Sequence, residues 1–417
     1  MAQAIVTEKL LKKALQKEGT ISELEIKNLC SEGENFASDL LEVNFNFSNE
    51  DHEDVAYNFV VKYPNKESFL HQSVAIMNGY KKETMMFHEL IPDATNWQQK
   101  RFGEIKYQIP VPKVIYCDEE TDLIIMENLS KSNFLVEPRQ IGKNFEQCKA
   151  LMKCIAEFHA ILLAYVQSFT SDEEFFEKYP YARNSDKAMF KAMLEHPDAL
   201  AQKEQMISPI LNAIKSAAPL KKDLVDKYLK HILTKALAKN TYMSIFPNEE
   251  FNVICHGDLW NNNVMFSKDD SGEIKNCKLV DLQLYKYCSP AVDLTHFLFV
   301  SAAMDVIVNH RKELLEVYYE AFKKAMKEME SDVKFTFDGL YAHLEGFYDA
   351  GLQNAVMSAS MMFAPKDKIV KANIKDADEN PLLEFSKQIE KLLENIDESL
   401  LERLISLLEL GEQLNLY

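Results

Sequence analysis

The stretch ICHGDLWNNNVMF, residues 254–266, places a histidine, an aspartate and three consecutive asparagines between apolar residues. The run FNVIC at 251–255 leads into it and is short and apolar, which is typical of a buried strand. We therefore expect His256, Asp258 and Asn263 to lie on a polar loop at the end of a strand. The four residues between Asp258 and Asn263 allow a tight loop that turns both side chains toward one cleft. By itself, this spacing also fits a plain polar turn.

A second short run, NCKLVDL at 276–282, follows a loop that contains SKDDSGE. Turn-forming residues before a short apolar run indicate a strand. The runs at 251–255 and 276–282 therefore predict a small strand pair embedded among helices. Asp281 then stands at the end of the second strand.

The chain before residue 129 is predicted to be mostly sheet. Apolar and polar residues alternate over 41–47 and again over 55–61, and the acidic turn SNEDHED separates the two runs. This pattern indicates a hairpin of half-buried strands. Lys62 ends the second strand on the face opposite its aromatic and apolar residues, which are Tyr57, Phe59 and Val61.

A helix and two more strands are expected to complete this part. Residues 66–90 have helical spacing and carry Glu83, and Pro92 is expected to follow the end of the helix. The segments at 107–118 and 121–129 are strand-like.

The chain after Leu129 changes to helical periodicity. The predicted helices span 144–167, 187–196, 203–216, 221–239, 291–308, 311–330, 338–357 and 380–411. We therefore predict an α+β, bilobal architecture, with a small antiparallel-sheet lobe at 1–128, a hinge at 126–129 and a large helical lobe at 129–417.

Composition excludes several classes of partner. Among the 417 residues, 47 Lys and Arg stand against 65 Asp and Glu, so the net charge of -18 opposes binding to nucleic acid or to an acidic membrane surface. Residues 1–20 form an amphipathic pattern that ends near Gly19 and is unlike a signal peptide, and no apolar run reaches the roughly 18 residues of a membrane span. The seven scattered cysteines indicate free thiols in a reducing compartment. We expect a cytoplasmic protein with no nucleic acid, no membrane and no evident protein partner.

The polar residues fit phosphoryl transfer from ATP. This reaction needs a carboxylate to orient the attacking hydroxyl, oxygen ligands for magnesium and a cation on the phosphates. Asp258 is the candidate base, and Asn263 and Asp281 are the candidate metal ligands. Lys62 paired with Glu83 is the candidate phosphate-binding cation, although a solvated strand lysine is the plain alternative.

Three further polar residues have plainer interpretations. His256 is expected to brace the loop by bonding its backbone. Asp293 lies just after Pro290, before an apolar helix, so we expect an N-cap of that helix, which is compatible with a role in bracing the loop. His159 lies among apolar residues of a helix, and a satisfied core histidine is the better interpretation.

Taken together, these motifs resemble the ecdysteroid kinase-like, or CHK kinase-like, family of small-molecule kinases, relatives of choline kinases and aminoglycoside phosphotransferases. The resemblance runs along nearly the whole chain. It rests on the motifs GENFAS (33–38), VVKYP (60–64), KKETMMFHELIP (81–92), LIIMENL (123–129), HGDLWNNN (256–263) and KLVDLQ (278–283). Phe36 and Leu282 depart from the usual tyrosine and phenylalanine of the family, but neither change removes a catalytic group.

The resemblance implies a protein-kinase-like fold with ATP and Mg²⁺ as cofactors. It assigns Asp258 as catalytic base and Asn263 and Asp281 as metal ligands. It further implies a nucleotide site that includes the phosphate loop and the hinge. The residues implied there are Lys62, Glu83, Asn35, Ser38, Glu127 and Leu129.

The acceptor is expected to be a small molecule. Only eleven residues separate Asp281 from Asp293, and Pro290 is not followed by glutamate, so the chain has no room for a peptide platform. The resemblance implies a hydroxylated acceptor such as an ecdysteroid or xenobiotic, bound between the helical insert 170–247 and the helices of 296–362. Two alternatives stay open: a choline- or aminoglycoside-type kinase of a polar substrate, and a non-catalytic nucleotide- or steroid-binding module.

Overall fold

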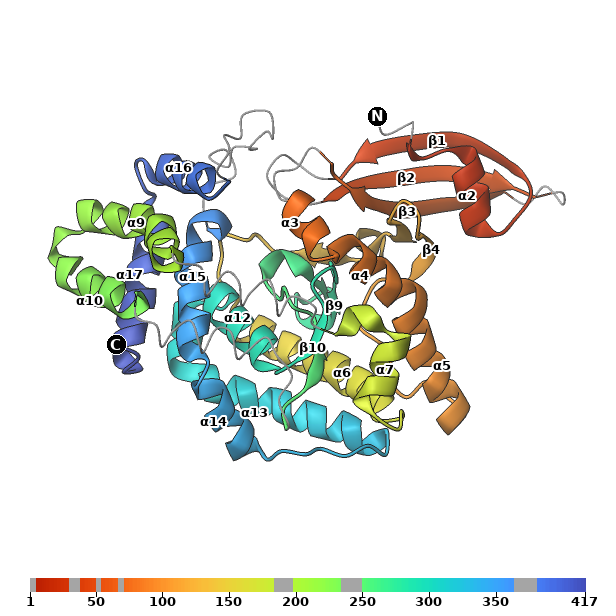
Figure 1. Cartoon of the computed structure of the whole chain (residues 1–417). Helices are drawn as coiled ribbons and strands as arrows, with labels where there is room; N and C mark the ends of the chain where they lie inside the picture. The colour runs from red at the N-terminus through yellow and green to blue at the C-terminus, as the bar shows by residue number, and fades with distance from the viewer. Residues whose placement is uncertain are drawn as a thin grey trace.

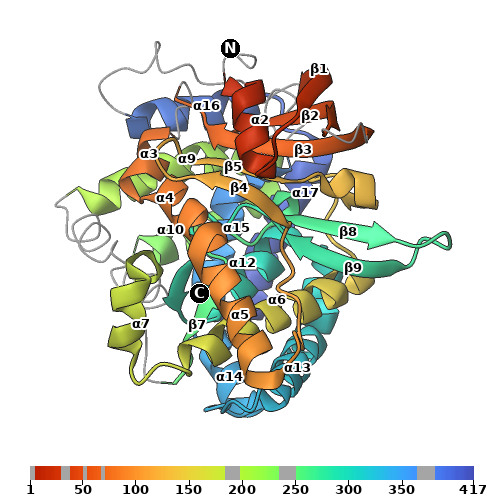
Figure 2. The same cartoon turned by 90° about the vertical axis from the view of Figure 1, so that its right-hand side faces the viewer.

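The structure is a computed structural model that describes residues 5–29, 38–49, 54–66, 71–183, 198–233, 250–363 and 381–417. A sheet lobe stands above a larger helical lobe, and the second view shows α2 over the outer face of the sheet (Figures 1 and 2). The predicted α+β bilobal fold is confirmed. The predicted helix 187–196, the loop residues 33–37 with Asn35, and Cys30 lie outside the described residues.

The sheet lobe is one antiparallel sheet of five strands in the order β1-β2-β3-β5-β4. Its strands are β1 (Thr20–Asn28), β2 (Ser38–Ser48), β3 (Asp54–Pro64), β4 (Val114–Asp118) and β5 (Leu123–Glu127). Successive side chains of a strand point to opposite faces. Phe59 and Val61 therefore pack in a small core with helix α2 (Glu8–Leu15), whereas Val60 joins the main core. The predicted hairpin is confirmed, and Lys62 shares the inward face with Val60.

Strand β1 was not predicted, because a bulge interrupts its alternation. Glu23 has a φ of 52°, and the pairing of β1 with β2 shifts register between Ser22 and Glu25. Such a bulge places an extra residue in one strand and breaks the period of two that identifies strands in a sequence.

The predicted helix 66–90 is wrong at its end and is not continuous. Asn78, in the left-handed conformation with a φ of 56°, separates α3 (His71–Ile76) from α4 (Gly79–Met85). After α4 the chain forms a π-helical turn at Met86–Leu90 and continues as α5 (Ile91–Phe102). The amide of Ile91 donates to the carbonyl of Met86, five residues back. Pro92 lacks an amide hydrogen and follows this wider turn in the first turn of α5, so it does not end the helix.

The helical lobe is built around α6 (Phe145–Val166), most of which is buried, and around α13 (Met304–Glu328), which packs along it. The other helices are α7 (Asp172–Lys178), α9 (Ala199–Ala217), α10 (Lys222–Ile232), α12 (Ala291–Ser301), α14 (Phe337–Glu345), α15 (Tyr348–Met362), α16 (Pro381–Leu393) and α17 (Glu398–Gln413). Breaks divide three of the predicted helices, at Ala302–Ala303, at Gly346–Phe347 and at 394–397.

The predicted pairing of the two short strands is wrong. Strand β7 (Val253–Cys255) pairs with β10 (Lys286–Cys288), whereas β9 (Ile274–Leu279) pairs with β8 (Val264–Lys268). The loop SKDDSGE is the turn of the β8–β9 hairpin, and β6 (Phe134–Val136) completes that sheet. A hairpin between neighbouring segments closes a much shorter loop than the predicted pair, which is entropically easier. The catalytic-loop candidates still lie between β7 and β8, and Asp281 follows β9.

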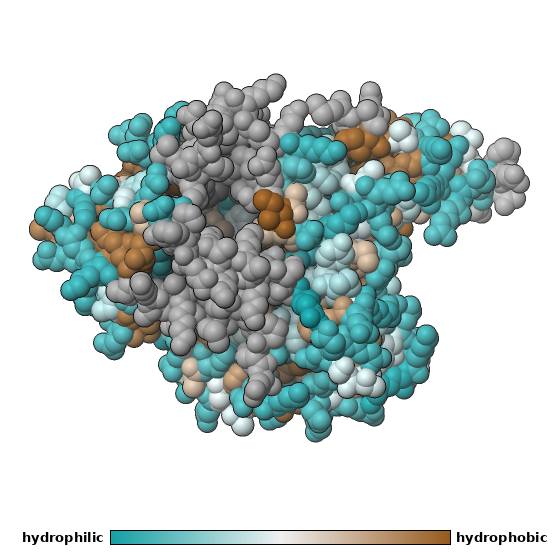
Figure 3. Space-filling model, viewed as in Figure 1, coloured by the Kyte–Doolittle hydropathy of each residue, from teal (hydrophilic) through white to brown (hydrophobic). Residues whose placement is uncertain are grey.

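The surface of the described chain agrees with its composition. Hydrophilic residues cover most of the described surface in Figure 3, with hydrophobic residues gathered over the sheet and near α9 and α10. Within the described ranges, no helix combines the length and apolar character needed to cross a membrane. The six described cysteines are free.

Candidate active site

The loop after β7 needs glycine at position 257. Gly257 has a φ of 86°, in the left-handed region that side chains rarely adopt. A Cβ atom added there would lie 2.0 Å from the carbonyl oxygen of Leu284, which belongs to backbone and cannot swing away. The close approach of the backbones at Gly257 and Leu284 therefore fixes the path of the chain after β7 and the position of Asp258.

Asp293 holds the same loop from α12. Its two carboxylate oxygens accept hydrogen bonds from the amides of His256 at 2.6 Å and Gly257 at 2.8 Å. His159 bonds the same carboxylate through Nε2 at 2.9 Å and Tyr318 through Nδ1 at 2.9 Å. Burial raises the pKa of Asp293, but the hydrogen bond and charge of His159, together with His256 and the amide of Gly257, outweigh it, so that the pKa lies below its usual value. The N-cap interpretation of Asp293 is wrong, because α12 has Pro290 at its cap and no side-chain cap bond.

His256 bonds the backbone on both sides of the loop. Its Nε2 bonds the carbonyl of Val280 at 2.9 Å, and its Nδ1 accepts from the amide of Asp258 at 3.3 Å. The ring is buried and thereby connects the loop after β7 to the residue that precedes Asp281.

Asp258 and Asn263 lie side by side. The side-chain amide of Asn263 donates to the backbone carbonyl of Asp258 at 2.8 Å and to its Oδ2 at 3.0 Å. The amide nitrogen is thus used within the loop, and the side-chain oxygen of Asn263 is left as an acceptor. Burial is the main cause that raises the pKa of Asp258; Asp281 adds to it, and His296 and His256 oppose it.

Lys62 joins two carboxylates from different parts of the chain. Its Nζ lies 2.6 Å from Oε2 of Glu83 and 2.8 Å from Oδ1 of Asp281. Glu83 also accepts the amide of Leu282 through Oε1 at 3.0 Å. Burial lowers the pKa of Lys62, but the charges and hydrogen bonds of Asp281 and Glu83 raise it by more. The net pKa is therefore above its ordinary value, and the amine stays charged at neutral pH. The alternative of a solvated strand lysine is wrong, since Lys62 is 7% exposed.

Asp281 occupies a strained backbone position. Its φ is 66°, in the left-handed region that non-glycine residues seldom adopt. Such strain persists only where surrounding contacts hold it, and it is common at functional sites. Here the ion pair with Lys62 and the bond from Leu282 to Glu83 fix the chain on both sides.

A cavity of about 510 Å³ lies between the lobes and collects most of the predicted nucleotide and metal residues. Of the predicted site residues, Lys62, Glu83, Glu127, Leu129, Asn263 and Asp281 line it. Asp258 does not line the cavity but adjoins it through its bond to Asn263.

Two other predicted nucleotide residues have particular positions. Ser38 begins β2 and is buried, and its Oγ has no hydrogen-bond partner in the described ranges. The carboxylate of Glu127 is engaged outside the cavity: its Oε1 accepts from the amide of Lys113 at 2.8 Å and from Nζ of Lys278 at 2.5 Å. Glu127 therefore ties the hinge strand β5 to β9.

Sequence reasoning missed two residues beside the loop. The side-chain amide of Asn261 donates to the carbonyl of Arg139 at 3.1 Å, and its backbone amide donates to the hydroxyl oxygen of Ser301 at 3.1 Å. His296 lies with Nε2 4.0 Å from Oδ1 of Asp258. The signal for His296 was its position three residues after Asp293, which places both side chains on one helix face.

His159, Cys255 and Asp293 also lie within 4.8 Å of one another, as a metal site would require. Both nitrogens of His159 are, however, engaged with Tyr318 and Asp293, and the thiol of Cys255 donates to the carbonyl of Ser289 at 3.2 Å. We therefore interpret this group as a buried hydrogen-bond network.

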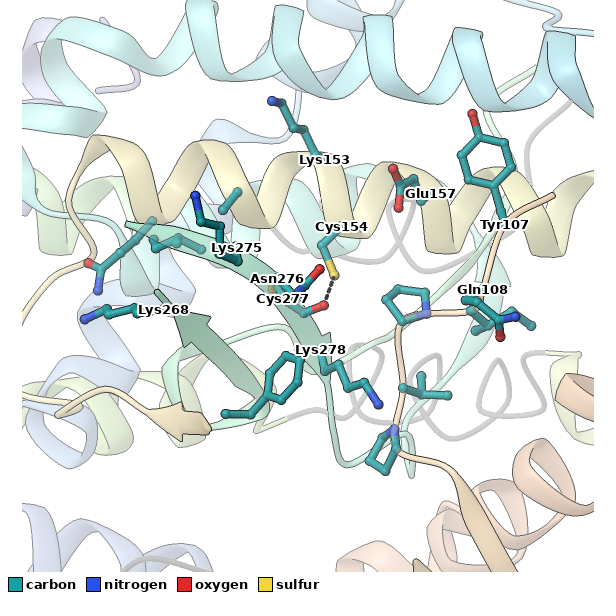
Figure 4. Close-up of a pocket in the computed structure, with 18 of the residues that line it drawn as sticks. Tyr107, Gln108, Lys153, Cys154, Glu157, Lys268, Lys275, Asn276, Cys277 and Lys278 are labelled. Carbon is teal, nitrogen blue, oxygen red and sulfur yellow. Dashed lines mark hydrogen bonds between the residues drawn. The ribbon is translucent and has the colours of Figure 1, made fainter. Parts of the chain in front are cut away.

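A larger cavity of about 1450 Å³ lies behind the hinge and contains none of the predicted site residues. It runs between α6, the β8–β9 hairpin and the segment 106–114. Figure 4 shows Lys153, Lys268, Lys275 and Lys278 around it, with amines that point in different directions, and the thiol of Cys154 on the carbonyl of Cys277. The lysine amines do not converge on one point in this cavity.

Comparison with protein families matches residues 32–331 to the ecdysteroid kinase-like family, which is more than two thirds of the chain. No curated protein matches the chain. The matched range contains the loop of Asp258, the helix of Asp293 and every residue that lines the inter-lobe cavity except Leu29.

Proposed function

The chain belongs to the ecdysteroid kinase-like family, and from this premise we propose that it is an ATP- and Mg²⁺-dependent kinase that phosphorylates a hydroxyl of a small, lipophilic molecule. An ecdysteroid or a hydroxylated xenobiotic is the acceptor class we propose. The observation that carries the proposal is the convergence of Lys62, Asp281 and Asn263 on one cavity, with Asp258 bonded to Asn263 at its edge.

The donor atoms suit both ATP and magnesium. Magnesium is a hard cation that prefers oxygen ligands, and the carboxylate of Asp281 and the side-chain oxygen of Asn263 are of this kind. Lys62 is a charged, buried amine that suits a phosphate, and Glu83 fixes its position. When bound, Mg²⁺ would neutralise charge on the phosphates. Leu129, Glu127 and Ser38 are proposed as further nucleotide contacts, together with Asn35 from the sequence motif.

Asp258 is proposed as the catalytic base. Its carboxylate takes the proton of the acceptor hydroxyl as the hydroxyl oxygen bonds to the γ-phosphorus, and the bond from that phosphorus to the β,γ-bridging oxygen breaks to release ADP. A raised pKa supports this role, because a base with a pKa closer to the working pH accepts a proton more readily in the transition state. His256 and Asp293 are proposed to keep Asp258 in place through the loop backbone.

The division of labour between the lobes is also part of the proposal. We propose that residues 1–128 bind the nucleotide and that residues 129–417 supply the catalytic loop and the acceptor pocket. We further propose that the enzyme works in the cytoplasm, consistent with six free cysteines in the described chain.

The decisive experiment is incubation of the purified protein with γ-labelled ATP and Mg²⁺ and a panel of acceptors. The panel contains ecdysteroids, hydroxylated plant compounds, choline and an aminoglycoside. We expect labelled product from lipophilic alcohols and none from the Asp258→Asn variant. Product from choline or the aminoglycoside alone would favour the polar-substrate kinase. Nucleotide binding without any product would favour the non-catalytic module.

A further inference from the structure

His296 lies beside Asp258 with a buried nitrogen that has no hydrogen-bond partner. Its Nε2 is closed off from solvent and finds no donor or acceptor in the part of the chain that the structure describes. Oδ1 of Asp258 is 4.0 Å away, which is too far for a hydrogen bond. Buried polar atoms are nearly always bonded, so an exception at the candidate base calls for an explanation.

The helix of His296 is tied to the loop of Asp258. Asp293 and His296 stand three residues apart on α12, and Asp293 is held by the amides of His256 and Gly257. Since the same two amides lead into Asp258, these bonds tie the loop to α12. The brace therefore sets how far apart the backbones of His296 and Asp258 lie, and a turn of the imidazole can still adjust the gap between Nε2 and Oδ1.

We propose that His296 is an acceptor-positioning residue, which holds the acceptor's hydroxyl oxygen against Asp258; this inference rests on the proposed function. An oxygen at about 2.8 Å from both atoms fits across the gap of 4.0 Å, with an angle of roughly 90° at the oxygen. The hydroxyl would donate its proton to Asp258 and accept a hydrogen bond from Nε2–H of His296. Since Nε2 is closed off from solvent, a turn of the imidazole has to bring it to a hydroxyl that approaches over the exposed edges of the two side chains, which are 19% and 27% exposed.

The charge state of His296 agrees with this role. Burial is the largest influence and lowers the pKa of His296; Asp258 and Asp293 raise it, and His256 and Lys286 lower it. A neutral ring can donate through Nε2 without forming an ion pair that would occupy Asp258. Asp258 thus stays available for the proton of the hydroxyl.

The pair also defines the chemistry of the group that it accepts. The carboxylate of Asp258 accepts a hydrogen bond, and Nε2–H of His296 donates one. The substrate atom between them therefore has to be a donor and an acceptor at once. An alcohol oxygen meets this requirement, whereas an ammonium group has no lone pair and an ether oxygen has no proton. The inference therefore narrows the acceptor to a molecule that presents an unmodified alcohol at this point.

The test compares His296→Gln with His296→Asn in steady-state kinetics with the best acceptor of the panel. The amide nitrogen of glutamine reaches about as far as Nε2, whereas that of asparagine stops at the position of Nδ1. We expect the Asn variant to raise the acceptor KM about tenfold, the worth of one hydrogen bond. The Gln variant should recover most of this loss, and the KM for ATP should change less than about twofold in both.

His310→Ala is the matched control, since His310 lies on the exposed part of α13 and bonds only Glu313 in the described chain. Thermal unfolding of each variant shows that it is folded, and His296→Phe replaces any variant that is not. An unchanged acceptor KM in the Asn or Phe variant, with an active wild type, would overturn the role of His296 alone. An equal rise in both KM values would also overturn it, because that result indicates a purely structural effect. A wild type without product would instead overturn the proposed function and this inference with it.

Discussion

The two sides of the catalytic loop differ in how completely their polar groups are paired. On the nucleotide side, Lys62 contacts Glu83 and Asp281, and Glu83 also receives the amide of Leu282. On the opposite side, His296 faces Asp258 across 4.0 Å, and its Nε2 has no hydrogen-bond partner among the described residues. The pairs around Lys62 are therefore formed by protein groups alone, whereas under our proposal the gap beside His296 is filled by the acceptor hydroxyl.

The largest effect on catalysis is expected when the proposed base is removed, and this change should leave the nucleotide side intact. Asp258→Asn keeps the size of the side chain and its contact with Asn263, but the amide cannot take a proton. We expect kcat to fall roughly 10²- to 10⁴-fold, the usual contribution of a general base. Calorimetric titration with ATP and Mg²⁺ should show a Kd within about threefold of wild type, since this change costs well under 1 kcal/mol on the nucleotide side. Turnover equal to wild type would disprove the role of Asp258.

Lys62→Met tests the pairing on the nucleotide side. The change leaves the carboxylates of Glu83 and Asp281 close together without their shared cation. Breaking a buried ion pair in this way costs about 3–5 kcal/mol, although the part-exposed Asp281 reduces the cost toward the lower end. We expect lower stability in urea unfolding and a kcat/KM for ATP reduced roughly 100-fold, the kinetic equivalent of about 2.7 kcal/mol. Unchanged kinetics would show that the pair serves only the fold.

Asp293→Asn tests the brace that both sides share. The pKa of Asp293 in the folded protein lies below its ordinary value near 3.9, so the stability it contributes is fully present above about pH 5 and is lost as the pH falls through the folded pKa. The free energy of unfolding of the variant should be about 1–3 kcal/mol lower at pH 7. The reason is that the amides of His256 and Gly257 then donate to a neutral amide group, which is a poorer acceptor than a carboxylate.

Urea unfolding between pH 3 and pH 7 measures this effect. The difference between wild type and Asp293→Asn should shrink as the pH falls. Asp270→Asn, in the exposed turn of the β8–β9 hairpin, is the control and should stay within about 0.5 kcal/mol of wild type at each pH. A constant difference across the range would mean that the charge of Asp293 does not stabilise the loop.

The features that sequence predicted well are those with a regular period or a fixed spacing. The alternation of apolar and polar residues along β2 and β3 identified the hairpin and the face of Lys62. Successive residues of β3 point to opposite faces of the sheet, one of which packs in the main core and the other in the small core with α2. The short separation of Asp258 and Asn263 located them on one loop. The roles of these residues and the boundary at residue 128 stay predictions.

The features that sequence missed depend on contacts between distant segments. The bulge at Glu23 hid β1, and the π-helical turn before Pro92 carried a helix past a residue that usually ends one. Asp293 was assigned to the helix cap because its partners, the amides of the loop, lie 36 and 37 residues away. His296 has only its spacing of three residues from Asp293 as a sequence signal, and its distance of 4.0 Å to Asp258 became visible in the folded structure.

The smallest effect is expected from Lys278→Met. This variant removes a lysine–carboxylate pair near the hinge and is to be compared with Lys62→Met. Lys278 pairs with Glu127 of the hinge at 2.5 Å, but both side chains are about a quarter exposed. Ion pairs that solvent can reach contribute about 0–1 kcal/mol, and this partly buried pair should lie at the upper end, so the variant should unfold within about 1 kcal/mol of wild type and change the KM for ATP by less than about threefold. Both lysines bond carboxylates, and they differ in burial and in the side of the hinge strand that they occupy. If Lys278→Met lowered stability and raised the KM for ATP as much as Lys62→Met, any lysine pair near the hinge would have the same effect. The contacts of Lys62 with Glu83 and Asp281 would then have no specific role.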